Sequence, residues 1–259
     1  QTMNEMKRRI VMKKTTKMLA TSLLVAVGLA ACGSNSSSST NAANRLTMTT
    51  FGELTTLDSA DYDDVPSSDM MGQIFEGLYR VAANNKVDLG MAAQEPKVSE
   101  DGLVYTFTLR DAKWSDGSAV KAQDFVFTYR KLVNPQEGHV AQSADVFKNA
   151  KKIRSGELPV EELGVKALDD KTLEITLENP APYLPKLLTG SRFLPQSEAV
   201  AQKLGDQYGS NVSNVVVNGP FKLEGWTGSE LTWKLVKNAD YWDASNVALN
   251  EVTVNVSKE

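Results

Sequence analysis

Residues 100–117 read EDGLVYTFTLRDAKWSDG, and residues 120–127 continue with VKAQDFVF. Apolar and polar side chains alternate over residues 103–110, which is the period of a half-buried β-strand. The Asp-Gly pair at 116–117 is typical of a turn. Over residues 121–132 the apolar side chains recur at helical spacing, and the inward side carries Phe125, Val126, Tyr129 and Leu132. This stretch therefore predicts a strand, a turn and an amphipathic helix in succession.

The same two periods recur along the rest of the chain. Pro66 opens a predicted helix with Met70, Met71, Ile74, Phe75 and Leu78 on one side, and a short helix is expected over 197–204. Alternating or apolar runs predict strands at 46–51, 171–177, 231–236 and 252–256. Because strands and helices are interspersed throughout, the predicted fold class is mixed α/β.

The beginning of the chain has the pattern of an export signal. Lysines 13, 14 and 17 precede a mostly apolar run from Leu19 to Ala31. As a helix this run would span roughly 20 Å, short of the ~30 Å hydrocarbon core. A basic head, a short apolar middle and small residues favour a cleaved secretory signal over a membrane-spanning helix. We expect residues 1–31 to be the signal peptide, with translation starting at Met12.

Cys32 is the only cysteine, and it directly follows Leu29-Ala30-Ala31. Small residues before a cysteine resemble the lipobox of bacterial lipoproteins, in which the thiol is diacylated and the chain is cut in front of it. The alternative is a buried thiol in an ordinary helix. We predict lipidation of Cys32 and a flexible Ser/Asn-rich tether over residues 32–44, because such a segment cannot bury enough apolar surface to fold.

Composition argues against several classes of function. A net charge of −4 and the lack of a basic run beyond the leader give no sign of nucleic-acid binding. His139 is the only histidine, so neither a metal cluster nor a nucleophile–base pair is indicated, and no glycine-rich phosphate loop is present. The sequence therefore predicts a protein that is not an enzyme and has no metal or cofactor. The carboxylates between Asp58 and Asp69 fit a solvated loop and a cleft rim equally well.

Three segments carry a resemblance to a known family. They are residues 100–127, residues 168–177 (LDDKTLEITL), and NGPFKL at 218–223 followed by KNADYW at 237–242. In this order they are similar to the oligopeptide-binding proteins of ATP-binding-cassette importers, the family-5 extracellular solute-binding proteins. The resemblance extends over residues 45–259.

This resemblance implies a two-lobed fold of the periplasmic-binding-protein type (type II) and a length roughly twice that of the mature chain. We therefore expect only the amino-terminal lobe and its inserted subdomain. Residues 45–75 would form the first part of lobe I, 76–195 the inserted subdomain, and 196–259 the return into lobe I, which is truncated. The implied partners are an oligopeptide ligand, the permease and ATPase of the importer, and the membrane through the lipid anchor on its extracytoplasmic face.

The resemblance also suggests a ligand-binding loop. In the family, a segment shortly after a Leu-Asp pair offers main-chain groups to the bound peptide. Here the pair is Leu57-Asp58 and the matching loop is residues 62–66, so the role is carried onto Asp63, Asp64 and Val65. An extended peptide recognised through its backbone gains hydrogen bonds that do not depend on its side chains. Some relatives have a tyrosine near the ligand where residues 138–142 of this chain contain no aromatic residue.

Several functions remain open at this point. The leading hypothesis is a lipid-anchored binding protein that captures peptides for import. A peptide-pheromone receptor could use the same cleft, and other family members bind dipeptides, nickel complexes or haem. An exported peptidase is the least favoured class, because His139 is the only candidate base.

Substituting Cys32→Ser should abolish membrane retention, because both acylation and the cleavage that depends on it need the thiol. Membrane sedimentation of the wild-type and variant proteins measures this directly. A serine variant that still sediments with membranes and resists high salt would contradict the lipobox interpretation.

Overall fold

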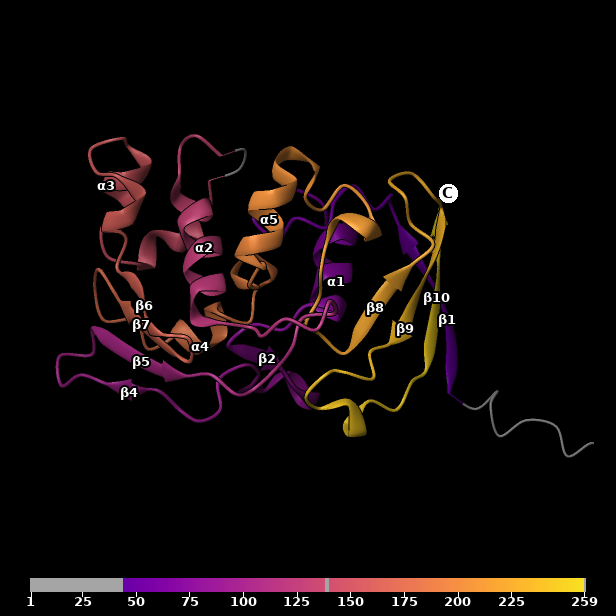
Figure 1. Ribbon diagram of the computed structural model, residues 1–259, viewed down its shortest axis with the longest axis horizontal. Coiled ribbons are helices and arrows are strands. Elements are labelled where there is room, and N and C mark those ends of the chain that lie inside the picture. Colours follow the sequence, from indigo (N-terminus) through magenta and orange to yellow (C-terminus); the bar gives the residue numbers. More distant parts are fainter. Residues whose placement is uncertain (1–43, 138–139, 259) are drawn as a thin grey trace, which may run out of the picture. The chain divides into compact units, whose positions relative to one another are not determined.

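The computed structural model describes residues 44–137 and 140–258 (Figure 1). The predicted signal peptide, Cys32 and His139 lie outside these residues. The described part contains two four-stranded sheets, one two-stranded ribbon and several short helices. Within it, no helix combines the length and the apolar character needed to cross a membrane.

One sheet joins the two ends of the described chain, in the strand order β1-β10-β9-β8. Strand β1 (Arg45–Phe51) runs parallel to β10 (Glu251–Ser257). Strand β9 (Thr232–Lys237) pairs antiparallel with β10 on one side and with β8 (Phe221–Glu224) on the other. Because β1 and β10 are parallel, their carboxyl ends lie at the same edge of the sheet.

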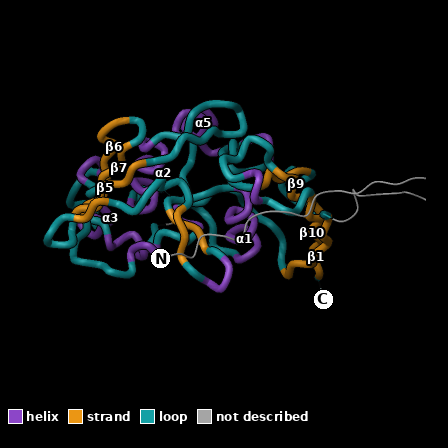
Figure 2. Tube along the Cα trace, turned by 90° about the horizontal axis from the view of Figure 1, so that it is seen from below, coloured by secondary structure: helices purple, strands orange, loops and turns teal. Residues whose placement is uncertain are grey.

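The other sheet contains the strand predicted at residues 103–110, and its strand order is β4-β5-β7-β6. The strands β4 (Lys97–Val98), β5 (Val104–Thr108), β7 (Thr172–Thr176) and β6 (Val165–Asp169) are antiparallel neighbours. Helix α2 (Ala122–Val133) packs on β6 and β7, as Figure 2 also shows. The predicted inward side chains of α2, Phe125, Val126, Tyr129 and Leu132, are all buried.

The remaining elements are short. Strands β2 (Tyr79–Val81) and β3 (Val87–Leu89) form the ribbon. Three small helices are α3 (Ala150–Arg154), α4 (Leu184–Leu187) and α5 (Glu198–Leu204). Turns of 3₁₀ helix lie at Ala83–Asn85, Gln142–Val146, Val160–Glu162, Ser191–Phe193, Gly205–Gln207, Val212–Asn214 and Ala244–Asn246.

Apart from the helix that begins near Pro66, the helices and strands predicted from the sequence are confirmed to within one or two residues. The mixed α/β class is also confirmed. The turn at Asp116-Gly117 is present, with Gly117 at φ +88°. The division into 45–75, 76–195 and 196–259 stays a prediction.

The helix predicted to open at Pro66 is α1 (Val65–Ile74), and its predicted continuation through Phe75 and Leu78 is wrong. Phe75 is already extended (φ −117°, ψ 159°). The Gly219 N–H donates to the Ile74 carbonyl (2.8 Å), which supplies a partner for the open end of the helix. Phe75 and Leu78 are nevertheless buried, so their apolar character identified the core correctly but not the helix end.

Gly219→Ala should destabilise the protein by about 1–3 kcal/mol through overpacking. A Cβ at this position would lie 2.5 Å from the Ile74 carbonyl carbon, which is backbone and cannot move aside cheaply. Gly72→Ala is the matched control, since a Cβ on this exposed residue of α1 meets nothing within 4 Å. It should stabilise by up to about 1 kcal/mol through helix propensity. Chemical denaturation of both variants measures the difference, and equal stabilities would contradict the close approach.

Candidate functional site

The carboxyl end of β1 lies directly beside the start of α1. Gly52 directly follows the strand with φ +96°, and a Cβ there would be 3.4 Å from Cγ of Pro66. The neighbouring strand ends at the same edge, where the Nζ of Lys258 lies 3.2 Å from Oε1 of Glu53. In α/β proteins ligands bind outside the carboxyl ends of parallel strands, and helix starts present free N–H groups there. We call the exposed surface formed by residues 51–53 and 63–65 the ligand edge.

Asp64 is the N-cap of α1, and its carboxylate is fully engaged by the fold. One oxygen accepts the Ser67 N–H at 2.7 Å. The other accepts hydrogen bonds from the hydroxyls of Ser67 (2.8 Å) and Thr55. An N-cap carboxylate satisfies a donor that the first turn of the helix leaves open. The side chain of Asp64 therefore caps the helix and shapes the loop.

Val65 is the first residue of α1 and is 69% exposed. Helix geometry gives its N–H no intrahelical acceptor. Pro66 follows in the first turn, where a missing N–H costs the helix nothing. Asp63, just before the cap, is also exposed. The main chain of residues 63–65 thus reaches the surface at a point where an outside acceptor can approach it.

The loop before the ligand edge is fixed by contacts with residues that are distant in sequence. The Leu57 N–H donates to the Gly209 carbonyl at 2.8 Å. The carboxylate of Asp58 accepts hydrogen bonds from Nε2 of Gln196 (2.6 Å) and from Nζ of Lys131 (3.0 Å). Asp58, which the sequence left open as a rim residue, is 9% exposed and acts as an anchor.

Asp63, Asp64 and Val65 are consecutive in the chain, and the structure gives them different surroundings. Asp63 and Val65 face solvent, whereas Asp64 is a helix cap. The cap could have been recognised from the sequence. Asp64 stands two residues before Pro66 and three before Ser67, where an apolar helical pattern begins. The ligand-binding role of the three residues stays a prediction, and Cys32 lies outside the described residues.

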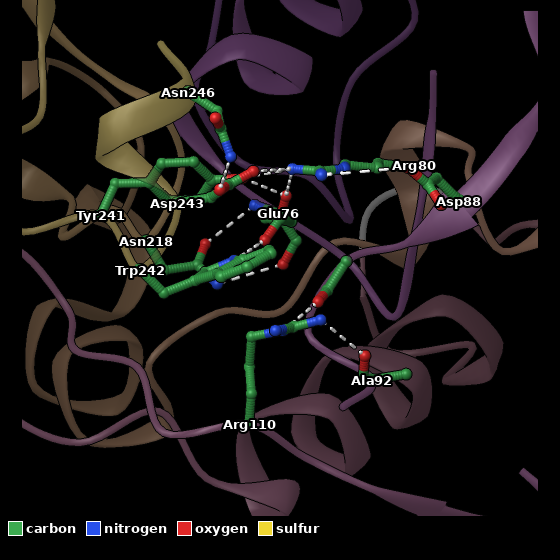
Figure 3. Close-up of polar contacts among 11 residues, drawn as sticks. Glu76, Arg80, Asp88, Ala92, Arg110, Asn218, Tyr241, Trp242, Asp243 and Asn246 are labelled. Atoms are coloured by element: carbon green, nitrogen blue, oxygen red, sulfur yellow. Dashed lines mark hydrogen bonds and ion pairs between the residues drawn. The ribbon is translucent and has the colours of Figure 1, made fainter. Parts of the chain in front are cut away.

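Sequence reasoning missed a buried polar cluster around Glu76, shown in Figure 3. The Glu76 side chain is 4% exposed, and its two oxygens accept hydrogen bonds from the Tyr241 hydroxyl and Nε1 of Trp242. Arg80 lies 3.4 Å from the same carboxylate and 3.0 Å from both the Tyr241 hydroxyl and Asp243. Burial is the main influence on this carboxyl, and it raises the pKa of Glu76 above its usual value although these donors oppose it.

Arg110 and Asn218 extend the Glu76 cluster to two further segments (Figure 3). The Arg110 guanidinium stacks over Trp242, 3.5 Å from the ring centroid, and donates to the carbonyls of Gly90 and Ala92. The amide of Asn218 accepts the Glu76 N–H (2.9 Å) and donates to the Glu76 carbonyl (3.0 Å). The family-like stretches 100–127, 218–223 and 237–242 therefore meet around Glu76: the last at its carboxylate, the second at its main chain, and the first through Arg110 on Trp242.

A cavity of about 550 Å³ lies beside the Glu76 cluster. The polar groups of the cluster satisfy one another, so the cluster fits a structural joint rather than a reactive site. In residues 44–137 and 140–258, no three His, Cys, Asp or Glu side chains are placed to hold a metal ion.

Comparison with known proteins gives consistent matches. The family described as bacterial extracellular solute-binding proteins, family 5 Middle, matches residues 86–259. The Dipeptide-binding protein of Lactococcus lactis subsp. cremoris is 34% identical over 251 residues, which cover 94% of this chain and 45% of that protein.

Two solved structures are also similar. Listeria monocytogenes OppA bound to peptide has a TM-score of 0.80 and 38% identity over 83% of this chain and 42% of that one. The second is the structure of the pheromone receptor PrgZ, which describes how that receptor binds peptide. Its TM-score is 0.78, with 34% identity over 83% of this chain and 43% of that one. The chain spans less than half the length of these relatives.

The raised pKa of Glu76 predicts a specific pH dependence. A carboxyl whose pKa is higher in the folded than in the unfolded state contributes stability at acidic pH and loses it as the pH rises through the folded pKa. Glu76→Gln has no such titration. The free energy of unfolding of wild type minus that of the variant should therefore decrease as the pH rises above about 4.5, the usual glutamate value.

Urea denaturation of both proteins between pH 4 and pH 8 measures this difference. Glu230→Gln is the control, because hydrogen bonds from Thr227 lower the pKa of Glu230 to about 2, the opposite direction to Glu76. An advantage of wild type over Glu76→Gln that grows with pH would contradict the burial argument.

Proposed function

Because the chain belongs to the bacterial extracellular solute-binding proteins of family 5, we propose that it captures oligopeptides outside the cytoplasm and delivers them to an ATP-binding-cassette importer. The observation that supports this most is the ligand edge. It presents main-chain groups of residues 63–65 beside the carboxyl ends of β1 and β10, on a rigid support. The permease and ATPase of the importer are the partners this function requires.

The proposed mode of binding is backbone pairing. An extended peptide would lie along residues 63–65 and accept a hydrogen bond from the Val65 N–H, which leaves its side chains free of selection at this point. The Asp63 side chain, being exposed, would stand at the rim. Such a mode suits a protein that must accept many peptide sequences.

Lipid anchoring completes the proposal. Acylation at Cys32 would fix the protein to the extracytoplasmic face of the membrane, and residues 32–44 would separate the folded part from the lipid surface.

Residues 76–195 would form a subdomain inserted into a lobe made of 45–75 and 196–259. In support, the sheet β1-β10-β9-β8 draws its strands from the outer two segments, and the other four-stranded sheet lies wholly in the inserted one.

A peptide-pheromone receptor is the second candidate, and the likeness to PrgZ favours it specifically. The two functions share a ligand class and differ in the process that peptide binding starts, which is uptake in one case and signalling in the other. Deleting the gene should prevent growth on peptides as the only amino-acid source if the protein serves import. It should instead abolish a response to one particular peptide if the protein is a receptor.

The direct test of peptide capture uses the complete gene product, purified as the cell makes it. Peptides released from it by acid are identified by mass spectrometry, and binding of a mixed peptide library is measured by calorimetry. No released peptides and no heat of binding would overturn the proposal.

Val65→Pro should weaken peptide binding about five- to a hundredfold, because one main-chain donor in a desolvated cleft is worth on the order of 1–3 kcal/mol. Proline is well tolerated at the first position of a helix, so the fold should survive the change. Asp63→Ala keeps every main-chain group and is the matched control, with little expected effect. If calorimetry shows that both variants bind peptide as tightly as wild type, the ligand does not contact this edge.

A further inference from the structure

The side chain of Arg192 contacts residues 60–62, in the loop just before the ligand edge. Arg192 belongs to the 3₁₀ turn Ser191–Phe193, about 130 residues away in sequence from the loop it contacts. One of its nitrogens donates to the Tyr62 carbonyl at 2.5 Å, and another lies 3.5 Å from the Ala60 carbonyl. Its Cζ also lies 4.3 Å from the centre of the Tyr62 ring.

These contacts fall between the two other anchors of the same loop. Upstream, the carboxylate of Asp58 accepts the Ala60 N–H at 2.9 Å. Downstream, Asp64 caps α1. Arg192 holds the residues in between through a guanidinium, whose planar fork of donors can serve two carbonyls while its face stacks on an aromatic ring.

The turn that carries Arg192 is itself fixed to the first turns of α1. The Ser191 hydroxyl donates to the Ser68 carbonyl at 3.1 Å and lies 3.0 Å from the Ser68 hydroxyl. One short turn therefore contacts both the helix and the loop before it. Through this pair of contacts it sets the position of residues 63–65 relative to the axis of α1.

We propose that Arg192 is a positioning residue of the ligand edge. By fixing Ala60 and Tyr62 it keeps the main chain of residues 63–65 in the geometry that pairs with an extended peptide. This inference rests on the proposed function. Its physical basis is preorganisation, since apparent affinity falls in proportion to the fraction of molecules whose site is in the competent conformation.

Arg192→Ala should weaken peptide binding about tenfold, as a drop in the competent fraction predicts. The loss should appear as slower association with unchanged dissociation, because the bound state makes the same contacts. Amide hydrogen exchange should become faster at residues 60–64 and stay unchanged in the sheets. Arg192→Lys keeps the positive charge over Tyr62 and one donor, and it should recover part of the affinity.

The matched control is Arg154→Ala. Arg154 is also a half-buried arginine, paired with Asp145 at 2.8 and 3.0 Å on a different part of the chain, and its loss should leave peptide affinity unchanged. Surface plasmon resonance with the peptides recovered from the wild-type protein measures both rates. If the alanine variant does not fold, the lysine variant carries the test, with an expected loss of about two- to fivefold.

The outcomes separate this inference from the proposed function. Wild-type protein that binds no peptide overturns both. Wild-type binding with unchanged affinity in Arg192→Ala overturns the inference alone. Weaker binding through faster dissociation, with unchanged exchange at residues 60–64, also overturns it, because Arg192 would then touch the ligand directly.

Discussion

The buried carboxylate of Glu76 is the constraint on which the rest of this structure depends. A carboxylate that is 4% exposed is tolerable only when partners surround it. Arg80 lies four residues away on the same segment, whereas Tyr241 and Trp242 come from far along the chain, and Asn218 bonds the Glu76 main chain. Removing one member would leave a buried polar or charged group without its partner. The loss of stability would then exceed the net contribution of the interaction itself. The cluster therefore fixes the segments that supply it in one arrangement.

This joint determines where the ligand edge lies. Asn218 and Gly219 hold residues Ile74 and Glu76, so α1 must end there. A ten-residue helix is a rigid rod of about 15 Å, and fixing one end fixes the other. The opposite end of α1 is where Asp64 caps the helix beside Gly52 and the end of β1. The Glu76 cluster and the ligand edge thus lie at opposite ends of one helix.

The loop before α1 combines local order with an exposed main chain. Its backbone is held at Leu57 by Gly209 and at Tyr62 by Arg192, and the Asp58 side chain is held by Gln196. Its last residues remain at the surface. Rigid support under an exposed backbone lowers the entropy that binding must otherwise remove. For backbone recognition this matters more than the identity of the exposed side chains.

The sequence alone determined the strand–turn–helix unit at 100–127 and the mixed α/β class, because periodicity and turn pairs are local signals. The role of residues 63–65 was carried over from the family resemblance and stays a prediction. It could not determine where α1 ends, since Phe75 and Leu78 fit a helical face and only the contact with Gly219 terminates it. Nor could it show that Asp58 is an anchor, or that Glu76, Arg110 and Trp242 meet. Such contacts join residues up to 166 positions apart, and no local pattern encodes which buried charge finds which partner.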